Sequence, residues 1–374
     1  MKKRILKIVG IIVCVIAILV IVVNIYSAVL RKKFSEMPIQ ERMDCVYEKI
    51  DHGQGDCFYI LAGDGSFSYK NYSGDFKEDS KYVNASVTKM YTATIIFQLM
   101  QEGRIRLSDS ITIYLPQDEL AGIHQYKGVD YTDKITINHL LCQTSGLPDF
   151  FTDKIRDEKT YMDILIEQGD YSYSFSDALD RTRQLEAKFI PGKENKAYYS
   201  DLNYHLLSQI IETVTKKSLA DNYNERIMGP LGLENTYLME EGMQSGVVPI
   251  YYNGRSYNPE KYLISDRGAG GIITTLDESM IFLQAFMQGK LFDIEKLEDW
   301  ENFYSIQFFP MKYGMGMMKC DLPLNDFAIG HSGSAGSLAY YFPEKDIYIV
   351  GTTNDLDEAG SIQKMYKLIQ YISL

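Results

Sequence analysis

The sequence predicts an α+β fold, in which both ends of the chain contribute strands to one antiparallel β-sheet. Three observations lead to this prediction: β-type segments near residue 57, a helix-rich middle, and β-type segments again from residue 327. Strands at both ends around a helical middle favour a single sheet flanked by helices, with a mostly helical insertion at about 108–266. We expect a cleft between the sheet and this insertion.

The first strands are predicted to form a hairpin. Cys57 to Ile60 and Ser66 to Tyr72 are rich in aromatic and β-branched residues, and Gly63-Asp64-Gly65 divides them as a turn. The C-terminal strands are expected at 327–331, 337–342 and 347–353, followed by a final helix at about 361–372.

Three helices stand out between these strands. Ser86 to Glu102 is apolar almost all round, which predicts a helix buried in the centre of its domain that ends at Gly103. Tyr204 to Lys216 has one apolar face, as expected of a helix packed on one side. A third helix is predicted to begin at Thr275, where Thr275-Leu276-Asp277-Glu278 matches a capping box.

The first 33 residues differ from the rest of the chain, because they contain seven Lys or Arg and no acid. Ile8 to Leu30 has no charged residue and, at about 1.5 Å per residue, would span roughly 34 Å, enough to cross a hydrocarbon core of about 30 Å. No short apolar region ending in small residues precedes a cleavage site, so an uncleaved anchor is favoured over a signal peptide. Residues 1–33 are therefore predicted to be a cytoplasmic tip and a transmembrane anchor.

The net charge of −12 is an average over two unlike parts. Without the basic N-terminus, residues 34–374 hold 31 Lys and Arg against 50 Asp and Glu, a net charge of −19. Such a charge argues against nucleic acid as a partner, because binding the phosphate backbone depends on Lys and Arg. We expect no metal and no cofactor, since the five His and five Cys show no HExxH or CxxC spacing. Cys45 and Cys57 flank the first strand, and the sequence leaves open whether they form a disulfide or stay free thiols.

The segment Ser86-Val87-Thr88-Lys89 is the strongest candidate for a catalytic motif. Positions three apart are neighbours on a helix, so the Lys89 side chain can reach the Ser86 hydroxyl. A serine at a helix start also faces free backbone N–H groups, which stabilise negative charge. Alone, this motif is a weak signal. An alternative interpretation of Ser86 is an ordinary helix cap. The same spacing also occurs at Ser361 to Lys364, which we interpret as the solvated face of the final helix.

Two later segments strengthen this interpretation. Tyr199-Ser200-Asp201 and His331-Ser332-Gly333-Ser334 follow Ser-x-x-Lys in the order of the motifs of the serine β-lactamase and penicillin-binding protein superfamily, which the chain resembles. It is most similar to the class C β-lactamase, D,D-peptidase and esterase branch. Further segments with this resemblance are Thr144-Ser145-Gly146-Leu147, Pro230-Leu231-Gly232-Leu233 and Tyr313-Gly314-Met315-Gly316.

The resemblance implies that residues 34–374 form a β-lactamase-like serine hydrolase domain in which Ser86 attacks a carbonyl and becomes acylated. Lys89 and Tyr199 would share the proton transfers, with His331 near them. The backbone N–H groups of Ser86 and Ser334 would form the oxyanion hole. The residues expected to contact substrate are Asp201, Ser332, Gly333 and Ser334. The residues alone leave two alternatives open. Asp201 is also in the position of an N-cap for the next helix. For His331 the alternative is a half-buried structural histidine.

Two departures from the branch bear on the substrate. Asp201 stands where the branch usually has Asn, and an ionised carboxylate accepts hydrogen bonds and attracts an ammonium group. His331 stands where a Lys would hold the free carboxylate of a penicillin or a peptide terminus, and a neutral His does so poorly. D-alanyl esters fit both departures, and similar membrane-anchored members of the superfamily remove D-alanine from teichoic acids.

The sequence thus predicts a membrane-anchored, extracytoplasmic serine hydrolase, single-pass in the cell membrane, acting on teichoic acid D-alanyl esters or related cell-envelope groups. Two alternatives stay open. One is a D,D-carboxypeptidase or class C-like β-lactamase acting on peptidoglycan stem peptides or β-lactams. The other is a penicillin-binding sensor or scaffold without turnover.

Overall fold

The computed structural model describes residues 36–322, 326–356, 360, 362–364 and 367–368. The chain divides into two compact units, residues 1–51 with 363–374 and residues 52–362. The first unit contains helix α2 (Ile39–Tyr47), and the second contains all the elements discussed below. The predicted membrane span at Ile8 to Leu30 lies outside the described residues, as does part of the predicted final helix. Within the described ranges no helix combines the length and the apolar character needed to cross a membrane.

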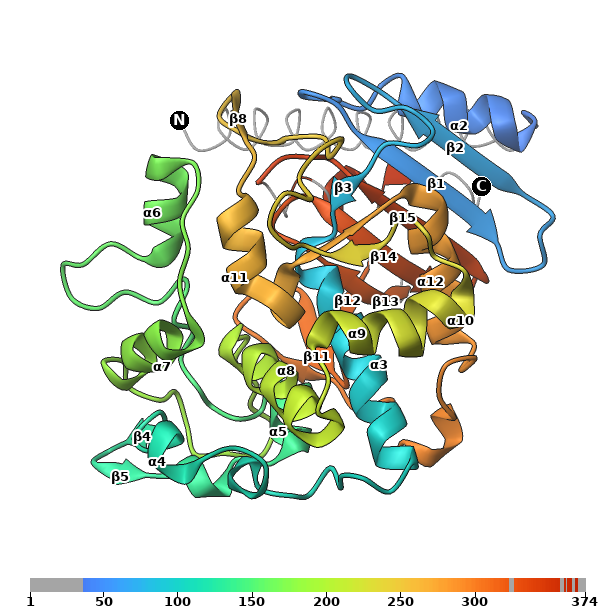
Figure 1. The fold of residues 1–374 in the computed structure, drawn as a ribbon. Coiled ribbons are helices and arrows are strands. Elements are labelled where there is room, and N and C mark those ends of the chain that lie inside the picture. The colour runs from blue at the N-terminus through green and yellow to red at the C-terminus, as the bar shows by residue number, and fades with distance from the viewer. Residues whose placement is uncertain (1–35, 323–325, 357–359, 361, 365–366, 369–374) are drawn as a thin grey trace, which may run out of the picture. The chain divides into compact units, whose positions relative to one another are not determined.

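An antiparallel sheet of eight strands forms the centre of residues 52–362, as predicted (Figure 1). The N-terminal hairpin pairs with the last strand, with Cys57 opposite Thr352, so both chain ends share one sheet. In spatial order the strands are β10 (Tyr304–Ser305), β11 (Met311–Gly314), β12 (Met317–Asp321), β13 (Phe327–Ser332), β14 (Ser337–Phe342), β15 (Ile347–Thr352), β1 (Cys57–Ala62) and β2 (Ser68–Tyr72).

The three predicted helices are present with shifted ends. The buried helix α3 (Thr88–Gln101) begins two residues after Ser86, which lies in the preceding 3-10 turn η1 (Ala85–Val87). Helix α8 (Leu202–Thr215) begins two residues earlier than predicted. Helix α12 (Leu276–Met287) packs on the sheet.

The capping box predicted at Thr275 is half correct. The Thr275 hydroxyl accepts the Glu278 N–H, as predicted. The Glu278 carboxylate, however, does not return to the Thr275 backbone. It accepts the Asn235 N–H and the Thr236 hydroxyl, which belong to a distant segment that no local pattern could predict as partners.

The segment between β2 and β10 carries the remaining helices and three small sheets, and in Figure 1 α6, α7, β4 and β5 lie away from the main sheet. Its helices are α4 (Gln117–Leu120), α5 (Ile137–Leu141), α6 (Tyr161–Gln168), α7 (Phe175–Arg183), α9 (Leu219–Tyr223), α10 (Gly229–Leu231) and α11 (Glu260–Gly270). The 3-10 turns are η2 (Ile111–Ile113), η3 (Thr132–Lys134) and η5 (Ile294–Lys296), and η4 (Asn224–Met228) is a short π-helix. The short strands are β3 (Tyr82–Val83), β4 (Gln125–Tyr126), β5 (Val129–Asp130), β6 (Tyr237–Leu238), β7 (Ile250–Tyr252), β8 (Arg255–Tyr257) and β9 (Ile272–Thr274).

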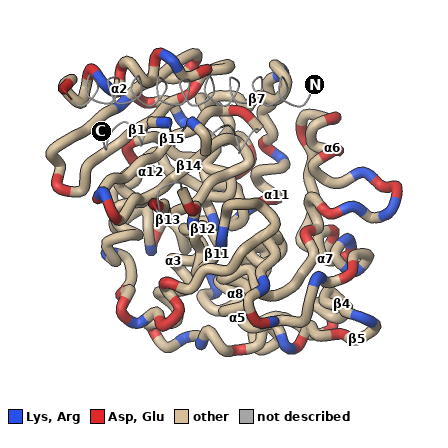
Figure 2. Tube along the Cα trace, turned by 180° about the vertical axis from the view of Figure 1, so that it is seen from behind, with Lys and Arg blue, Asp and Glu red and all other residues tan. Residues whose placement is uncertain are grey.

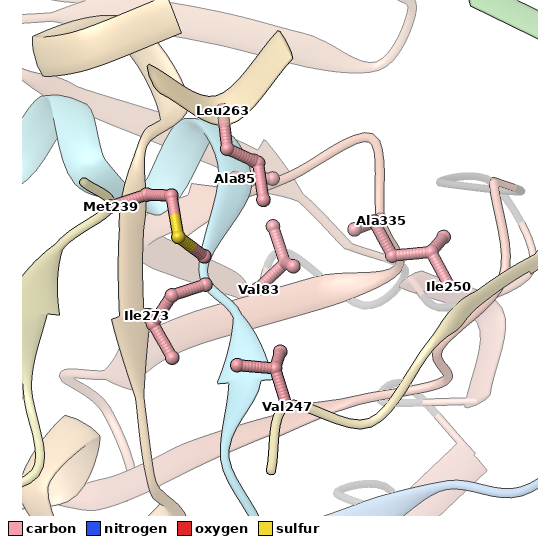
Figure 3. Close-up of a cluster of buried hydrophobic side chains, with 8 residues drawn as sticks. All are labelled: Val83, Ala85, Met239, Val247, Ile250, Leu263, Ile273 and Ala335. Carbon is pink, nitrogen blue, oxygen red and sulfur yellow. The ribbon is translucent and has the colours of Figure 1, made fainter. Parts of the chain in front are cut away.

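A buried apolar cluster joins these small elements to the turn that carries Ser86 (Figure 3). Burying a Val, Leu, Ile or Met side chain stabilises the fold by about 1.5–3 kcal/mol, so the larger members of the cluster hold the turn in place. Its members are Val83, Ala85, Met239, Val247, Ile250, Leu263, Ile273 and Ala335.

Acidic and basic residues are interspersed along the helices and loops in the view of Figure 2. The loop before α6 is an example, where Lys154 and Lys159 alternate with acids such as Asp157 and Glu158. Each of the four described cysteines, Cys45, Cys57, Cys142 and Cys320, carries a free thiol.

Candidate active site

The turn that carries Ser86 is held from two sides. Ala85, the residue before it, has a φ of 44°, a left-handed conformation that costs free energy for any residue with a Cβ. The backbone of Asn84 donates to the Ile272 carbonyl at 2.9 Å, and its own carbonyl accepts the Ser337 hydroxyl at 2.7 Å. These bonds to β9 and β14 hold the strained turn in place. Ser86 itself is half-buried, and neither η1 nor α3 is capped by a side chain, so capping does not explain this serine.

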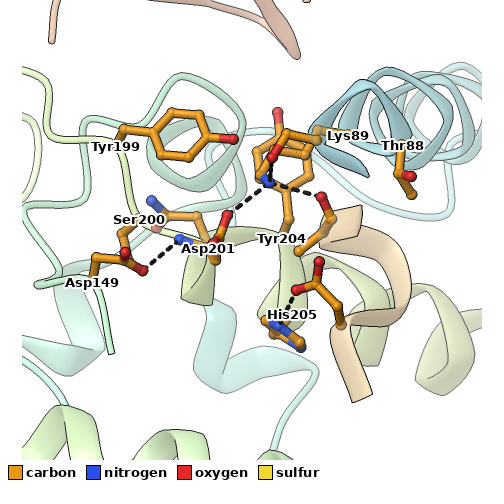
Figure 4. Close-up of polar contacts among 12 residues, drawn as sticks. Thr88, Lys89, Asp149, Tyr199, Ser200, Asp201, Tyr204 and His205 are labelled. Carbon is orange, nitrogen blue, oxygen red and sulfur yellow. Dashed lines mark hydrogen bonds and ion pairs between the residues drawn. The ribbon is translucent and has the colours of Figure 1, made fainter. Parts of the chain in front are cut away.

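Lys89 lies one helical turn after Ser86 and is completely buried. Its ammonium donates to the Ser86 Oγ at 3.0 Å and to the Ala269 carbonyl at 2.7 Å, and it forms an ion pair with the Asp201 Oδ1 at 2.7 Å (Figure 4). An ammonium has three donors and no acceptor. All three are used, so the nitrogen lies where it can stabilise negative charge that forms on the Ser86 oxygen.

Tyr199 faces the Lys89 ammonium, whose nitrogen lies 5.0 Å from the centre of the tyrosine ring (Figure 4). The Tyr199 backbone is fixed by Gln307, whose side chain accepts the Tyr199 N–H at 2.8 Å and donates to the Tyr199 carbonyl at 2.9 Å. Gln143 holds the next residue, since its side-chain oxygen accepts the Ser200 N–H at 2.9 Å. We did not predict either glutamine, because both are far from Tyr199 in the sequence and belong to no motif.

Asp201 occupies the N-cap position of α8, but its side chain makes no capping bond. Its carboxylate, 14% exposed, pairs with Lys89 instead. Its backbone N–H donates to the Asp149 Oδ1 at 3.1 Å. Burial raises the pKa of Asp149 to about 7, with a smaller contribution from the neighbouring Asp201 charge. Asp149 is therefore partly protonated at neutral pH, which limits the repulsion between its carboxylate and that of Asp201.

His331 is completely buried on β13. Its Nδ1 donates to the Ser332 carbonyl at 2.7 Å, and its Nε2 lies 3.1 Å from the Tyr313 hydroxyl oxygen. Burial, with a further contribution from the Lys89 charge, lowers the pKa of His331 to about 3. The histidine is thus neutral and held under the site, 6.2 Å from the Tyr199 ring between centroids. The geometry agrees with a structural histidine better than with a proton carrier.

The other tyrosines near Lys89 keep their protons. Burial raises the pKa of both Tyr204 and Tyr313 far above the usual value. Their hydroxyl oxygens lie 3.1 Å apart, and Tyr204 also donates to the Leu141 carbonyl at 3.1 Å. Tyr199 is left as the tyrosine best placed to exchange a proton near Ser86.

The segment after β13 lies against the Ser86 turn. A Cβ on Gly333 would lie 2.7 Å from the Ala85 Cβ and 3.0 Å from the Ser86 nitrogen, so only glycine allows this approach. Ser334 follows at once, is half-buried and lines the same pocket as Ala85, and the oxyanion hole of Ser86 and Ser334 N–H groups stays a prediction. Ser332 is different: its side chain is fully buried and its hydroxyl donates to the Met318 sulfur at 3.5 Å, so its side chain is not presented to a substrate.

An apolar pocket opens beside these residues, between the sheet side and the inserted segment, where a cleft was predicted. Its walls include Ala85 and Ser334 on one side and Leu165 and Tyr262 on the other. The space inside it that a water-sized molecule can enter is small, about 20 Å³, and the rest of the hollow is open to solvent. Among the residues that the structure describes, no three His, Cys, Asp or Glu side chains gather as they would around a metal ion.

Comparisons with known proteins show the family and the fold of this chain. A family model described as Beta-lactamase matches residues 40–372. The Protein flp of Staphylococcus aureus (strain MW2) is 31% identical over 185 residues, which cover 48% of this chain and 32% of that protein. The chain thus spans about a third of the length of this curated relative.

Two solved structures are similar in fold. The D-stereospecific amidohydrolase from Streptomyces sp. has a TM-score of 0.71 at 25% identity, covering 87% of this chain and 96% of its own. The D-amino acid amidase from Ochrobactrum anthropi SV3 has a TM-score of 0.71 at 22% identity, covering 89% and 99%.

Proposed function

This chain belongs to the beta-lactamase family, and on that premise we propose that it is a serine hydrolase that works through an acyl-enzyme on Ser86. The observation that carries the proposal is the 3.0 Å hydrogen bond from Lys89 to the Ser86 Oγ at the start of α3. A hydroxyl that already receives a bond from a buried cation is prepared to carry negative charge.

We infer the following sequence of steps. The Ser86 Oγ attacks the substrate carbonyl as its proton passes to Tyr199, whose ionised form is stabilised by the Lys89 charge 5.0 Å from the ring centre. The carbonyl oxygen becomes negative and accepts the backbone N–H groups of Ser86 and Ser334. The leaving group takes the proton as its bond to the carbonyl carbon breaks. Water then hydrolyses the acyl-enzyme and frees Ser86.

We propose that the substrates are D-alanyl esters of teichoic acid or related cell-envelope acyl groups, and that Ile8 to Leu30 anchors the enzyme with residues 34–374 outside the membrane. The absence of a lysine at position 331 supports a substrate without a terminal carboxylate, since the neutral His331 offers it no counter-charge. The uncharged, basic-flanked segment at the N-terminus supports the anchor.

A second candidate is hydrolysis of D-amino acid amides. It is favoured by the likeness to the D-stereospecific amidohydrolase from Streptomyces sp., at 25% identity over 87% of this chain. Esters and amides of the same acyl group form the same acyl-enzyme, so the two candidates differ only in the leaving group.

The test compares Ser86→Ala with wild-type full-length protein in detergent micelles. The substrates are D-alanyl teichoic acid, D-alanine amide, a stem peptide and a chromogenic cephalosporin. Ser305→Ala, an exposed serine on β10, is the matched control. We expect release of D-alanine from the teichoic acid by wild type and Ser305→Ala and none by Ser86→Ala. Rapid cephalosporin or stem-peptide turnover without D-alanine release would replace this proposal with the β-lactamase or carboxypeptidase alternative.

A further inference from the structure

A second, larger cavity opens on the main sheet and shares no lining residue with the pocket beside Ser86. We call it the β12–β14 cavity, after the strands that form its floor. The space that a water-sized molecule can enter is about 400 Å³, compared with about 20 Å³ in the pocket beside Ser86. Cavities that bind small organic ligands commonly measure about 300–1,000 Å³, so this one is large enough for such a ligand.

One face of the main sheet forms the floor of the β12–β14 cavity. Strands β12, β13 and β14 are neighbours in that sheet (Figure 1). Lys319 on β12 is paired with Ile329 on β13, and Ile329 is paired with Tyr341 on β14. Met317 and Phe327 lie two positions away along β12 and β13, so they belong to the same face. All five side chains line the cavity.

A second wall of the cavity is held in place by aromatic packing. It includes Met287, the last residue of α12, with Trp300 and Phe303 from the segment before β11. The Trp300 ring centre lies 6.2 Å from that of Phe97 on the buried helix α3 and 5.6 Å from that of Phe286 on α12. Both partners are completely buried, so the wall is anchored in the core and the cavity is preformed.

Lys319 brings a positive charge into the cavity without a carboxylate partner. Its nitrogen lies 4.0 Å from the centre of the Phe327 ring and 5.8 Å from that of Phe303, so two aromatic faces position the ammonium group. Within the part of the chain that the structure describes, Lys319 forms no ion pair. Lys312 on the neighbouring strand β11, by contrast, is paired with Asp321 at 2.6 Å.

The charges at the cavity favour a negatively charged ligand. The other charged residue that lines it, Glu301, is exposed to water, which screens its charge. Lys319 is half-buried, and a charge that leaves water is stabilised by a partner of opposite sign. Most of the remaining lining residues are apolar or aromatic, so they gain free energy by excluding water from an apolar group.

We propose that the β12–β14 cavity binds a small carboxylate with an apolar chain, whose carboxylate meets the Lys319 ammonium and whose chain lies against Trp300 and Met317. A carboxylate fits better than a phosphate monoester, which would bring a charge of about −1.5 to −2 to a single cation. The flexible thioether of Met317 suits a chain that can bend. This site is separate from Ser86 and does not depend on the chemistry proposed there.

The first experiment measures binding of three water-soluble probes by ligand-observed NMR titration. It uses wild-type full-length protein in nanodiscs, with protein-free nanodiscs as the blank. Hexanoate has both features, hexan-1-ol has the chain without the charge, and acetate has the charge without the chain. We expect hexanoate to bind at least tenfold more tightly than either, because a charge-assisted hydrogen bond and burial of the chain act together. Hexan-1-ol that binds as tightly as hexanoate would overturn the anion assignment, and acetate that does so would overturn the role of the apolar walls.

The second experiment repeats the titrations with Lys319→Met, which keeps an unbranched side chain and removes the charge. We expect Kd for hexanoate to rise at least tenfold and Kd for hexan-1-ol to change less than threefold. Lys312→Met is the matched control, since its ammonium is already paired with Asp321, and it should leave both constants unchanged. Equal losses for both probes in Lys319→Met would overturn the assignment of the carboxylate to Lys319.

Two further variants locate the ligand even if Lys319→Met does not fold. Ile329→Trp places a larger side chain in the cavity and should raise Kd for hexanoate at least tenfold, whereas unchanged binding would place the ligand elsewhere. Ser86→Ala should bind hexanoate as wild type does. Loss of binding in Ser86→Ala would show that the carboxylate occupies the candidate active site, and would overturn the proposal.

Discussion

Replacing Asp201 by Asn tests the ion pair on which the geometry of the site depends. The substitution keeps the side-chain shape and an acceptor oxygen but removes the negative charge 2.7 Å from the Lys89 nitrogen. At an effective dielectric constant of about 20, that pair has a gross attraction of about 6 kcal/mol. Desolvation of a fully buried lysine and a carboxylate that is 14% exposed offsets much of it.

We expect a net loss of about 2 kcal/mol in the free energy of unfolding for Asp201→Asn, within the range measured for coupled neighbours. At about 2.1 cal/mol/K of unfolding entropy per residue, such a loss lowers the Tm of a unit of residues 52–362 by about 3 °C. The assay is thermal unfolding of the full-length protein at pH 7, followed by circular dichroism. The double variant with Lys89→Met should melt higher than the sum of the two single losses predicts, because the two side chains stabilise each other.

The matched control is Glu167→Gln, which breaks an exposed ion pair with Lys159 of 2.5 Å. Its side chains are 54% and 59% exposed, so the pair is screened by water and contributes little. An Asp201→Asn variant that melts within 1 °C of wild type, or no lower than Glu167→Gln, would refute the role given to this ion pair.

Three other predictions follow from the same site. His331 has a pKa of about 3 in the folded protein and of about 6.5 in the unfolded chain, so protonation favours the unfolded state. The free energy of unfolding should therefore fall by up to about 5 kcal/mol as the pH drops from about 6.5 to about 3. In denaturant titrations, His331→Gln should make the free energy of unfolding depend less on pH between these two values. An unchanged pH dependence would contradict the assignment of this effect to His331. Gly333→Ala places a Cβ 3.0 Å from the Ser86 nitrogen and should reduce kcat at least tenfold, with wild-type kcat as the contrary result. Gln307→Ala removes both bonds to the Tyr199 backbone and should lower kcat more than it changes KM, whereas a change in KM alone would show that Tyr199 only binds substrate.

Much of the fold was predictable because its signals are local. The Gly-Asp-Gly turn between two β-type runs predicts the β1–β2 hairpin, and the all-round apolar segment predicts the buried helix α3. Strands at both chain ends predicted one shared sheet, but the register that places Cys57 opposite Thr352 was not predicted. The errors lie at helix ends, where bonds to distant segments decide, as Glu278 shows by binding Asn235 and Thr236.

Proximity in the site was more predictable than the assignment of partners. Motif order placed Ser86, Lys89 and Asp201 in one site, and the structure brings them together. The sequence could not show that Asp201 pairs with Lys89, because the two residues lie on helices far apart in the chain. Nor could it show that His331 is fully buried, since burial depends on packing around the strand.

The central claim is that Ser86 carries the acyl group, and mass spectrometry of a quenched reaction tests it most directly. The full-length enzyme is mixed with a D-alanyl ester, quenched in acid within seconds, digested and mapped. We predict an alanyl adduct on the peptide that contains Ser86, present in wild type and in Ser305→Ala and absent in Ser86→Ala. An adduct on another residue, or turnover that persists in Ser86→Ala, would contradict the claim.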